Sequence, residues 1–296
     1  MEYGKRSMGE RLGQKKFLIG LDIGGTKIEA IFWSAGKIAR FKKIITPKNK
    51  RVFLEKIFLL IRQVAAGKNI AGIGIASAGA IDHTAGKILN SPNLKFLNGL
   101  RLGNLVGRKF SKPTKLENDA NCFLLAEWFF GQAKNKKNVV GLTIGTGVGG
   151  AVLIDGELLR GTHGAAGELG HMVISHTPQE PLTLEKTVAS HGFRRLGVLH
   201  PKACQDQANA GSRQAQAVYN QVGSYLGLGL ANFVNIFDPE LIIIGGGIAR
   251  AGHLLLDPAK REMKKHSMLP ANMLPVVKIS KLDHVGALGA VSLFLR

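Results

Sequence analysis

The chain has 296 residues, of which 45% are hydrophobic and 20% charged, and its formal net charge is +20. This composition is ordinary for a globular protein, and the length allows two packed lobes. No apolar run approaches the roughly 18 residues of a membrane span, which argues against an integral membrane protein. Residues 1–16 are polar and basic, which predicts a flexible tail and no secretory signal. The two cysteines, Cys122 and Cys204, form no disulfide framework, so we expect a cytoplasmic protein.

The positive charge is concentrated early in the chain, because residues 1–116 contain 23 Lys and Arg against 6 Asp and Glu. Such a surface could attract nucleotides, polyphosphate or nucleic acid, but a solvated basic surface is the simpler interpretation. A nucleic-acid-binding protein would show aromatic interleaving or a recognition helix, and neither is found. The 16 residues before the first strand are too few for a helix-turn-helix domain. We therefore expect no specific nucleic-acid partner and no membrane partner.

The first expected elements are two strands joined by a glycine-rich turn. The segment Leu21-Asp22-Ile23-Gly24-Gly25-Thr26-Lys27 stands between two apolar runs, at residues 17–20 and 28–33, which predicts a hairpin. Glycines in such a turn leave no Cβ between the backbone and a ligand, and successive N–H groups there can bind an anion. A carboxylate beside a phosphate site suits a Mg²⁺–nucleotide. A simple hairpin turn is the alternative at this point.

A second copy of this pattern occurs later in the chain. Residues 20–36 and 141–156 share one order of features: an apolar strand, a glycine-rich turn, a second apolar strand and a second turn, with one alignment gap. Two copies are too few for a solenoid. They indicate a duplicated unit, with one glycine-rich hairpin in each lobe closing on one phosphate chain. The second copy therefore favours a phosphate-binding turn over a simple hairpin.

Strands and helices alternate between the two hairpins, which indicates an α/β lobe. Polar turns at residues 77–82 and 90–94 come after a strand, where open α/β sheets bind ligands. Asn118 and Asp119 then begin a helix; Asp119 is either a functional carboxylate at the helix N-terminus or an N-cap. Hydrophobic spacing predicts these elements: helices at 51–66, 99–110 and 118–133, and strands at 70–76 and 114–117.

The second part of the chain contains a glycine-rich loop, residues 161–171, with one carboxylate, Glu168, and two histidines, His163 and His171. Its composition predicts a ligand-approach loop or a plain connector. Gly245, Gly246 and Gly247 end a buried strand in a turn towards a helix. The expected elements are a hairpin at 139–154, helices at 182–200, 212–235 and 284–295, and strands at 241–244 and 276–280.

Taken together, these motifs resemble the sugar kinases of the ROK family (repressor, open reading frame, kinase), within the actin/hexokinase-like superfamily. The resemblance implies an α/β class and a duplicated actin-like, ribonuclease-H-like ATPase fold, with two lobes around a central nucleotide–sugar cleft. We expect the lobes at residues 17–116 and 117–283, with a C-terminal helix at 284–296 that packs back on the first lobe. The motifs stand in family order over residues 17–296: Asp22–Lys27, Ser91–Leu94, Glu117–Asn121, Leu142–His171 and Asp238–Gly247.

The resemblance also implies roles for particular residues. Asp119 matches the base that takes the proton from the sugar 6-hydroxyl, and a lone carboxylate suffices because phosphoryl transfer depends mostly on positioning and charge stabilisation. The implied sugar contacts are Gly79, Asn93, Asn118, Glu168, His171 and Glu185. The implied nucleotide contacts are Asp22, Gly24, Gly25, Thr26, Gly145, Thr146, Gly147, Gly246 and Gly247. ATP and Mg²⁺ are the implied cofactors, and a homodimer is the implied assembly.

The sequence departs from the family between His171 and Glu185. The family has a zinc site there, built from a histidine and a cysteine cluster, whereas the intervening segment here contains no cysteine and is shorter. Histidines at His163, His176 and His191 are poor substitutes for a closed set of soft ligands. We therefore expect no structural zinc, and the order of the segment that carries Glu185 stays open.

Three functional hypotheses follow. The first is an ATP-dependent hexokinase of glucokinase type, with an N-acetylated hexosamine or fructose as the alternative sugar. The second is a non-catalytic sugar sensor, since the family includes repressors, although we expect no DNA-binding domain in this chain. The third is a polyphosphate-dependent glucokinase, for which the basic first lobe is the motive. The sequence does not identify the sugar.

Overall fold

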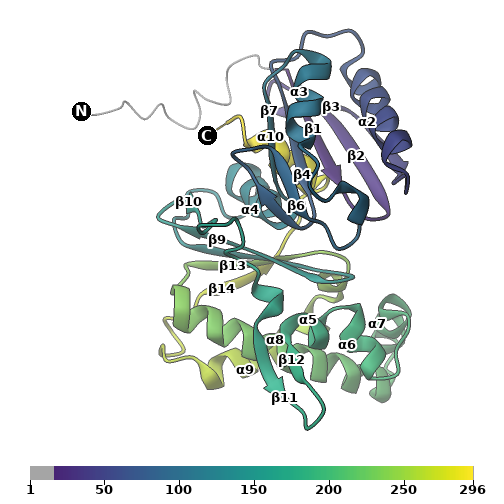
Figure 1. Cartoon of the computed structure of the whole chain (residues 1–296). Helices are drawn as coiled ribbons and strands as arrows, with labels where there is room; N and C mark the ends of the chain where they lie inside the picture. Colours follow the sequence, from purple (N-terminus) through teal and green to yellow (C-terminus); the bar gives the residue numbers. More distant parts are fainter. Residues whose placement is uncertain (1–16, 296) are drawn as a thin grey trace, which may run out of the picture. The chain divides into compact units, whose positions relative to one another are not determined.

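The structure is a computed structural model that describes residues 17–295, so the tail expected at residues 1–16 lies outside the described residues. The described chain forms two compact units. Unit 1 comprises residues 17–130, 161–165 and 282–295, and unit 2 comprises residues 131–160 and 166–281. Each unit is built around its own five-stranded sheet (Figure 1).

Unit 1 has the strand order β3-β2-β1-β4-β7, with β1, β2 and β3 antiparallel and β1, β4 and β7 parallel. Helices cover both faces of the sheet. The strands are β1 (Leu18–Ile23), β2 (Lys27–Ser34), β3 (Lys37–Ile45), β4 (Gly72–Ser77) and β7 (Thr114–Asn118). The helices are α2 (Lys50–Ala65), α3 (Leu102–Phe110), α4 (Asp119–Phe130) and α10 (Val285–Ser292). A small hairpin, β5 (Ala80–Asp82) and β6 (Lys87–Asn90), and the turn η1 (Lys95–Leu97) complete the unit.

Helix α2 shows how the sequence determines these elements. The Asn49 side chain caps its N-terminus by accepting from the N–H groups of Arg51 and Val52, and Ala66 ends it in a left-handed conformation. Its buried residues recur at helical spacing. They pack with α3 and with β-strand residues such as Leu21 and Ile28 in one apolar core.

Helices α4 and α10 cover the opposite face of the unit 1 sheet. Leu18, Ile31 and Trp33 of the sheet pack there against Phe129 of α4 and Val291 of α10. Unit 1 therefore extends to residue 130, beyond the lobe boundary expected at 116/117, because α4 shares its core with α10 and β1. The C-terminal helix packs on the N-terminal sheet.

Unit 2 repeats the topology of unit 1. Its strand order is β10-β9-β8-β13-β14, with β8, β9 and β10 antiparallel and β8, β13 and β14 parallel. The expected duplicated α/β fold is thereby confirmed, since both glycine-rich hairpins occupy equivalent places in their sheets. The strands are β8 (Val139–Ile144), β9 (Val148–Ile154), β10 (Glu157–Leu158), β13 (Leu241–Gly245) and β14 (Val276–Ile279).

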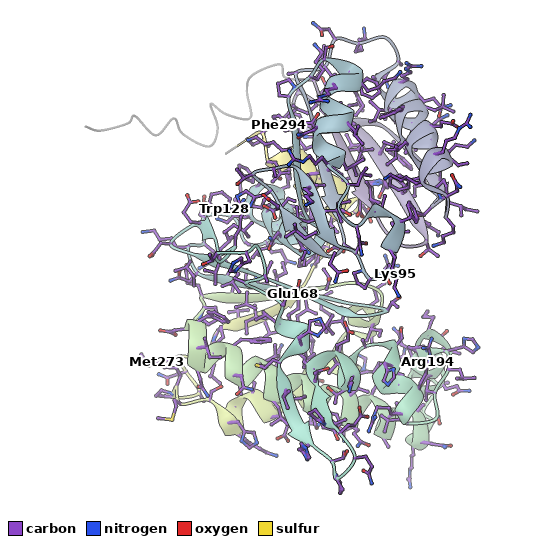
Figure 2. The ribbon with its side chains drawn as sticks, viewed as in Figure 1. Lys95, Trp128, Glu168, Arg194, Met273 and Phe294 are labelled. Atoms are coloured by element: carbon purple, nitrogen blue, oxygen red, sulfur yellow. The ribbon has the colours of Figure 1, made fainter. Side chains whose placement is uncertain are left out.

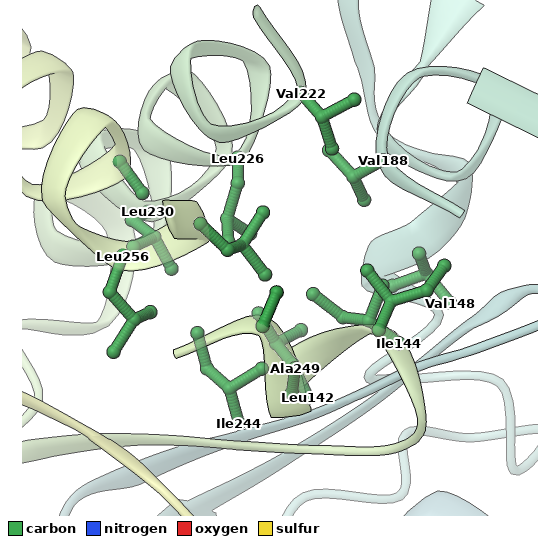
Figure 3. Packing of buried hydrophobic residues seen from close by; sticks show 14 of the residues in the cluster. Leu142, Ile144, Val148, Val188, Val222, Leu226, Leu230, Ile244, Ala249 and Leu256 are labelled. Carbon is green, nitrogen blue, oxygen red and sulfur yellow. The ribbon is translucent and has the colours of Figure 1, made fainter. Parts of the chain in front are cut away.

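A helical layer packs on the unit 2 sheet. Leu142 and Ile244 from the strands meet Leu226, Leu230 and other helical residues in one buried cluster (Figure 3). The helices are α5 (Leu184–Val188), α6 (Ser190–Arg195), α7 (Pro201–Asn209), α8 (Arg213–Phe237) and α9 (His253–His266), with short turns η2 (Leu169–His171) and η3 (Ile248–Ala251). Strands β11 (Val173–His176) and β12 (Pro181–Thr183) form a separate hairpin. No helix within residues 17–295 is both long and apolar enough to cross a membrane.

Some elements differ from those expected. The single helix predicted at 182–200 is wrong: the structure has β12 and then two short helices, because Ala189 adopts an extended conformation between them. Helices α7 and α9 were not predicted, and α9 contains Pro258, which usually argues against a helix interior. The glycine-rich segment 161–171 is a loop that ends in the short turn η2.

Helix α10 packs closely on the unit 1 sheet at a glycine of β4. A side chain at this glycine should therefore lower the stability of the fold. A Cβ on Gly74 in β4 would lie 1.9 Å from the carbonyl oxygen of Ala290 in α10. Gly74→Ala should therefore destabilise unit 1 by about 1–3 kcal/mol, because the helix must move off the sheet. Thermal or urea unfolding measures the loss. Gly247→Ala is the matched control, since Gly247 is α-helical in backbone conformation with no atom near its Cβ position; equal stability of the two variants would contradict the prediction.

Candidate functional site

The site residues predicted in unit 1 gather at one edge of its sheet. Strand pairing places Ile23 beside Ser77, and Ser77 beside Asn118, so the three parallel strands end together. Asp22 lies one residue before this edge, and Asp119 one residue after it. In an open α/β sheet this carboxyl edge is where ligands bind. The structure thus brings together groups that are far apart in the sequence.

The first glycine turn, residues 24–26, is held by backbone and side-chain contacts. The Gly24 N–H donates to the Lys27 carbonyl at 3.0 Å, the Thr46 hydroxyl donates to the Gly24 carbonyl at 2.8 Å, and the Lys48 ammonium donates to the Gly25 carbonyl at 2.5 Å. A Cβ on Gly25 would lie 3.0 Å from the Asn93 Cβ. The turn and Asn93 therefore lie side by side, which the sequence did not show.

Asn118, and not Asp119, provides the N-cap of α4. Its side-chain oxygen accepts from the N–H groups of Ala120 and Asn121 at 2.8 and 3.1 Å. Its amide nitrogen donates to the Gly79 carbonyl at 3.0 Å. The N-cap alternative for Asp119 is therefore wrong, and the Asp119 carboxylate lies in the first turn of the helix, half-buried, where the helix dipole favours a negative charge.

Asp22 lies in a crowded and negatively charged environment. Glu29 is its partner across the β1–β2 pair, and Lys43 is the partner of Glu29 across the β2–β3 pair, with Lys43 Nζ 3.3 Å from Glu29 Oε1. Burial, together with the carboxylates of Asp119 and Glu29, raises the pKa of Asp22 to about 7, and Lys43 opposes the shift. Two carboxylates held this way make a place where a cation binds favourably.

The start of α10 completes these surroundings. A Cβ on Gly286 would lie 2.4 Å from Asp22 Oδ2, so only glycine leaves room for the carboxylate. His284 pairs with Glu29 through Nδ1 and stacks on the ring of Phe41, with centroids 4.5 Å apart. Sequence reasoning missed this group. The hairpin register could have placed Glu29 opposite Asp22, but no sequence signal indicated His284.

In unit 2 the second glycine turn, residues 145–147, joins β8 to β9. Its own hydrogen bond runs from the Gly145 N–H to the Gly147 carbonyl at 2.9 Å. The Ser190 N–H and hydroxyl both donate to the Gly145 carbonyl, at 3.0 and 3.1 Å. Glu185 Oε2 accepts from the Val148 N–H at 2.8 Å. Glu185, predicted as a sugar contact, is thus ordered and lies against the glycine turn.

Glu168 and His171 stand at the two ends of the short turn η2, and both are exposed. Figure 2 labels Glu168. Glu168 Oε2 lies 4.0 Å from His171 Nε2. The turn is seated on β9, because a Cβ on Gly150 would lie 2.3 Å from the Gly167 carbonyl oxygen. The backbone of the turn is therefore held against β9, and the two side chains remain accessible to a ligand.

Gly246 and Gly247 follow β13 at the carboxyl edge of the unit 2 sheet. Gly246 has a φ of +92°, and a Cβ there would lie 2.3 Å from the Ile144 carbonyl oxygen. A side chain is thus excluded by both conformation and space. Both predicted glycine groups of unit 2 lie at this edge, since Thr143 pairs with Gly245.

Comparison with known proteins now decides the family. The model of the ROK family matches residues 18–296. The chain belongs to the ROK family. The predicted resemblance and the actin-like ATPase fold are both confirmed, because solved ROK structures superpose on nearly the whole chain.

Members of the ROK family with different activities are similar to this chain. A glucokinase of Thermotoga maritima is 31% identical over 93% of this chain and 96% of its own. A xylose repressor of Caldicellulosiruptor bescii is 28% identical over 94% of this chain and 78% of its own. The crystal structure of a Streptomyces griseus glucokinase in complex with glucose and AMPPNP has a TM-score of 0.80 and 26% identity, covering 94% of this chain and 98% of that one. The family therefore contains both sugar kinases and repressors.

Proposed function

We propose that this ROK protein is an ATP-dependent kinase of the hexose 6-hydroxyl, with glucose as the first candidate sugar. The observation that carries the proposal is that Asp22 and Asp119 both lie at the carboxyl edge of one sheet, beside a glycine turn, where the charge of Asp119 acts on Asp22. A repressor needs to bind a sugar, whereas a kinase also needs a base and a place for cation and phosphate. Similarity to two glucokinases supports glucose.

In the proposed reaction, Asp119 accepts the proton of the sugar 6-hydroxyl as the oxygen attacks the terminal phosphorus of ATP and ADP leaves. Asn118 fixes the start of α4 and so positions the Asp119 carboxylate. Phosphoryl transfer needs little more than this positioning and the stabilisation of charge on the transferred group. The residues proposed to contact the sugar are Gly79, Asn93, Asn118, Glu168 and His171.

The phosphates are assigned to the two glycine turns, whose N–H groups suit an anion, and the adenosine to Gly246 and Gly247. The Asp22 carboxylate fits Mg²⁺, because it is a hard oxygen donor in a negatively charged place. Burial, together with the nearby carboxylates of Asp119 and Glu29, raises its pKa to about 7. When bound, Mg²⁺ would neutralise charge on the phosphates. Asp22 would hold it together with phosphate oxygens and water.

The proposal is tested by sugar-dependent ADP formation with Mg²⁺ over a panel of glucose, fructose, N-acetylglucosamine, N-acetylmannosamine and allose. We expect turnover with ATP and the highest kcat/KM with glucose. A preference for another sugar of the panel would contradict glucose as the substrate but would still support the proposed kinase activity. Turnover with polyphosphate that exceeds turnover with ATP, and weakens at raised salt as screening predicts, would correct the donor.

A non-catalytic sugar-responsive protein is the second candidate, favoured by the similarity to the xylose repressor. Binding of a sugar by calorimetry, with no turnover of ATP or polyphosphate under any sugar, would establish it and overturn the kinase. The proposed homodimer is tested separately by light scattering on the purified chain.

A further inference from the structure

The segment between His171 and Glu185 is where the family resemblance implied a zinc site, and the residues present do not fit one. The segment contains no cysteine. Both cysteines of the chain are buried elsewhere, Cys122 in α4 and Cys204 in α7. No group of three or more His, Cys, Asp and Glu side chains able to hold a metal occurs among residues 17–295. A closed tetrahedral zinc site needs four such donors.

A hairpin takes the place of a metal-bound loop. β11 pairs with β12 from Val173 opposite Thr183 to His176 opposite Pro181. Thr177 closes its tip, because the Thr177 N–H and hydroxyl both donate to the carbonyl of Glu180, and the Glu180 N–H donates back to the hydroxyl. The hairpin thus needs no external ligand to close.

The same Glu180 ties the hairpin to the two helices that follow. One carboxylate oxygen lies 2.5 Å from Lys186 Nζ in α5, and the other pairs with Arg195 in α6. The hydrogen bonds from Lys186 and Arg195 lower the pKa of Glu180. Thr183 also caps the start of α5, accepting from the Lys186 N–H at 3.3 Å. Two cations from two helices therefore converge on one carboxylate of the hairpin.

The helices fastened in this way hold the second glycine turn at both ends. Glu185 of α5 accepts from the Val148 N–H on the β9 side, and Ser190 of α6 donates twice to the Gly145 carbonyl on the β8 side. A Cβ on Gly147 would lie 2.4 Å from Glu185 Oε2, so the carboxylate packs directly on the turn. The shape of this turn thus depends on the α5–α6 segment.

We propose that the Glu180–Lys186–Arg195 cluster replaces a structural metal in this chain, and that it holds Glu185 and Ser190 as positioning residues for the turn that binds the donor phosphates. The assignment of the turn to phosphate rests on the proposed function. Glu185 then acts through the backbone of the turn, and its loss weakens the nucleotide more than the sugar. The proposal that the Glu180–Lys186–Arg195 cluster holds this segment without a metal does not depend on any activity of the protein.

The first experiment measures metal and stability in the purified chain. Elemental analysis should find less than about 0.1 zinc per chain, and a chelator should leave Tm unchanged, because no ligand set is present to lose a metal. Stoichiometric zinc together with a fall in Tm on chelation would contradict the proposal that this segment is held without a metal. Neither readout requires that the protein be a kinase.

The second experiment measures binding of a non-hydrolysable ATP analogue by calorimetry, and the KM values for ATP and sugar. Glu185→Ala should weaken the analogue and raise the KM for ATP about tenfold, because an acceptor for a backbone N–H is lost, with little change in the KM for sugar. Glu185→Gln keeps an oxygen acceptor and should restore most of the affinity. A rise confined to the KM for sugar would make Glu185 a sugar contact and overturn its positioning role.

The cluster itself is tested by Glu180→Gln. We expect a rise of about three- to fivefold in the KM for ATP, the range of a surface ion pair, and a KM that depends less on salt than that of wild type. The matched control is Glu262→Gln in α9, since Glu262 likewise contacts two basic side chains, Lys265 and His266. Equal effects of the two variants would overturn the specific role of Glu180. Absence of turnover in wild type would refute the kinase, yet the calorimetric comparison would still decide the positioning role.

Discussion

Replacing Asp119 by Asn should lower kcat for sugar-dependent ADP formation by about 10²–10⁴-fold, the usual effect of removing a general base. The KM values for ATP and sugar should change by less than about threefold, because the amide has the shape of the carboxylate and binding does not depend on proton transfer. The helix should remain intact, since Asn118 provides its cap. Steady-state kinetics with a coupled ADP assay measures both quantities.

Asp257→Asn is the control for Asp119→Asn. Asp257 is an exposed aspartate in α9 that belongs to no predicted site, so its variant should retain wild-type kcat. Equal kcat for wild type and Asp119→Asn would eliminate Asp119 as the base. The kinase itself would then require another proton acceptor near the sugar.

Much of the fold follows from the sequence because its signals are local. Alternating apolar runs and glycine-rich turns predicted both hairpins. The repetition of residues 20–36 at 141–156 predicted a duplicated unit, and the structure has two sheets of one topology. Two predictions failed, one for a local reason and one for a tertiary reason. Pro258 hid helix α9, and the break at Ala189 came from tertiary contacts: Ser190 is held by Gly145, far away in the sequence.

The candidate site was predicted only where strands deliver residues to a common edge. Asp22 lies just before the end of β1, and Gly79 and Asp119 follow the ends of β4 and β7, so the pairing of three parallel strands brings them to one edge. Other contacts of the candidate site involve residues from segments far apart in the sequence. His284 reaches Glu29 from the C-terminal helix, and Glu185 turns to the Val148 amide, an orientation that no spacing in the sequence encodes.

Asp22→Asn should stabilise the free protein while it reduces the proposed activity. The pKa of Asp22 is raised from 3.8 to about 7 by burial, Asp119 and Glu29. The folded state therefore binds the proton more tightly than the unfolded chain does. Asp22 thus contributes its full stability only below about pH 4, and this stability is lost progressively as the pH rises to about 7. An uncharged amide does not carry this pH-dependent loss.

Asp22→Asn should therefore be more stable than wild type at a pH where the Asp22 carboxylate is ionised in the folded protein. In Mg²⁺-free buffer at pH 8, Asp22→Asn should raise Tm by roughly 3–8 °C, corresponding to about 1–3 kcal/mol. The gain should shrink steadily as the pH is lowered from 8 to 4. Differential scanning calorimetry across this range measures it, with Asp257→Asn, which alters an exposed aspartate, as the variant that should show no such trend.

The same substitution should lower kcat/KM with Mg²⁺–ATP by about 10²-fold or more, because a carboxylate ligand to the cation is lost. A functional carboxylate that is buried near other negative charges lowers the stability of the fold. Its removal should therefore raise Tm and lower activity together. A gain independent of pH would show that the gain does not come from the raised pKa of Asp22. A lower Tm at pH 8 would show that the Asp22 carboxylate stabilises the fold. Its burial beside Asp119 and Glu29 would then be structural, and the cation site would have to lie elsewhere.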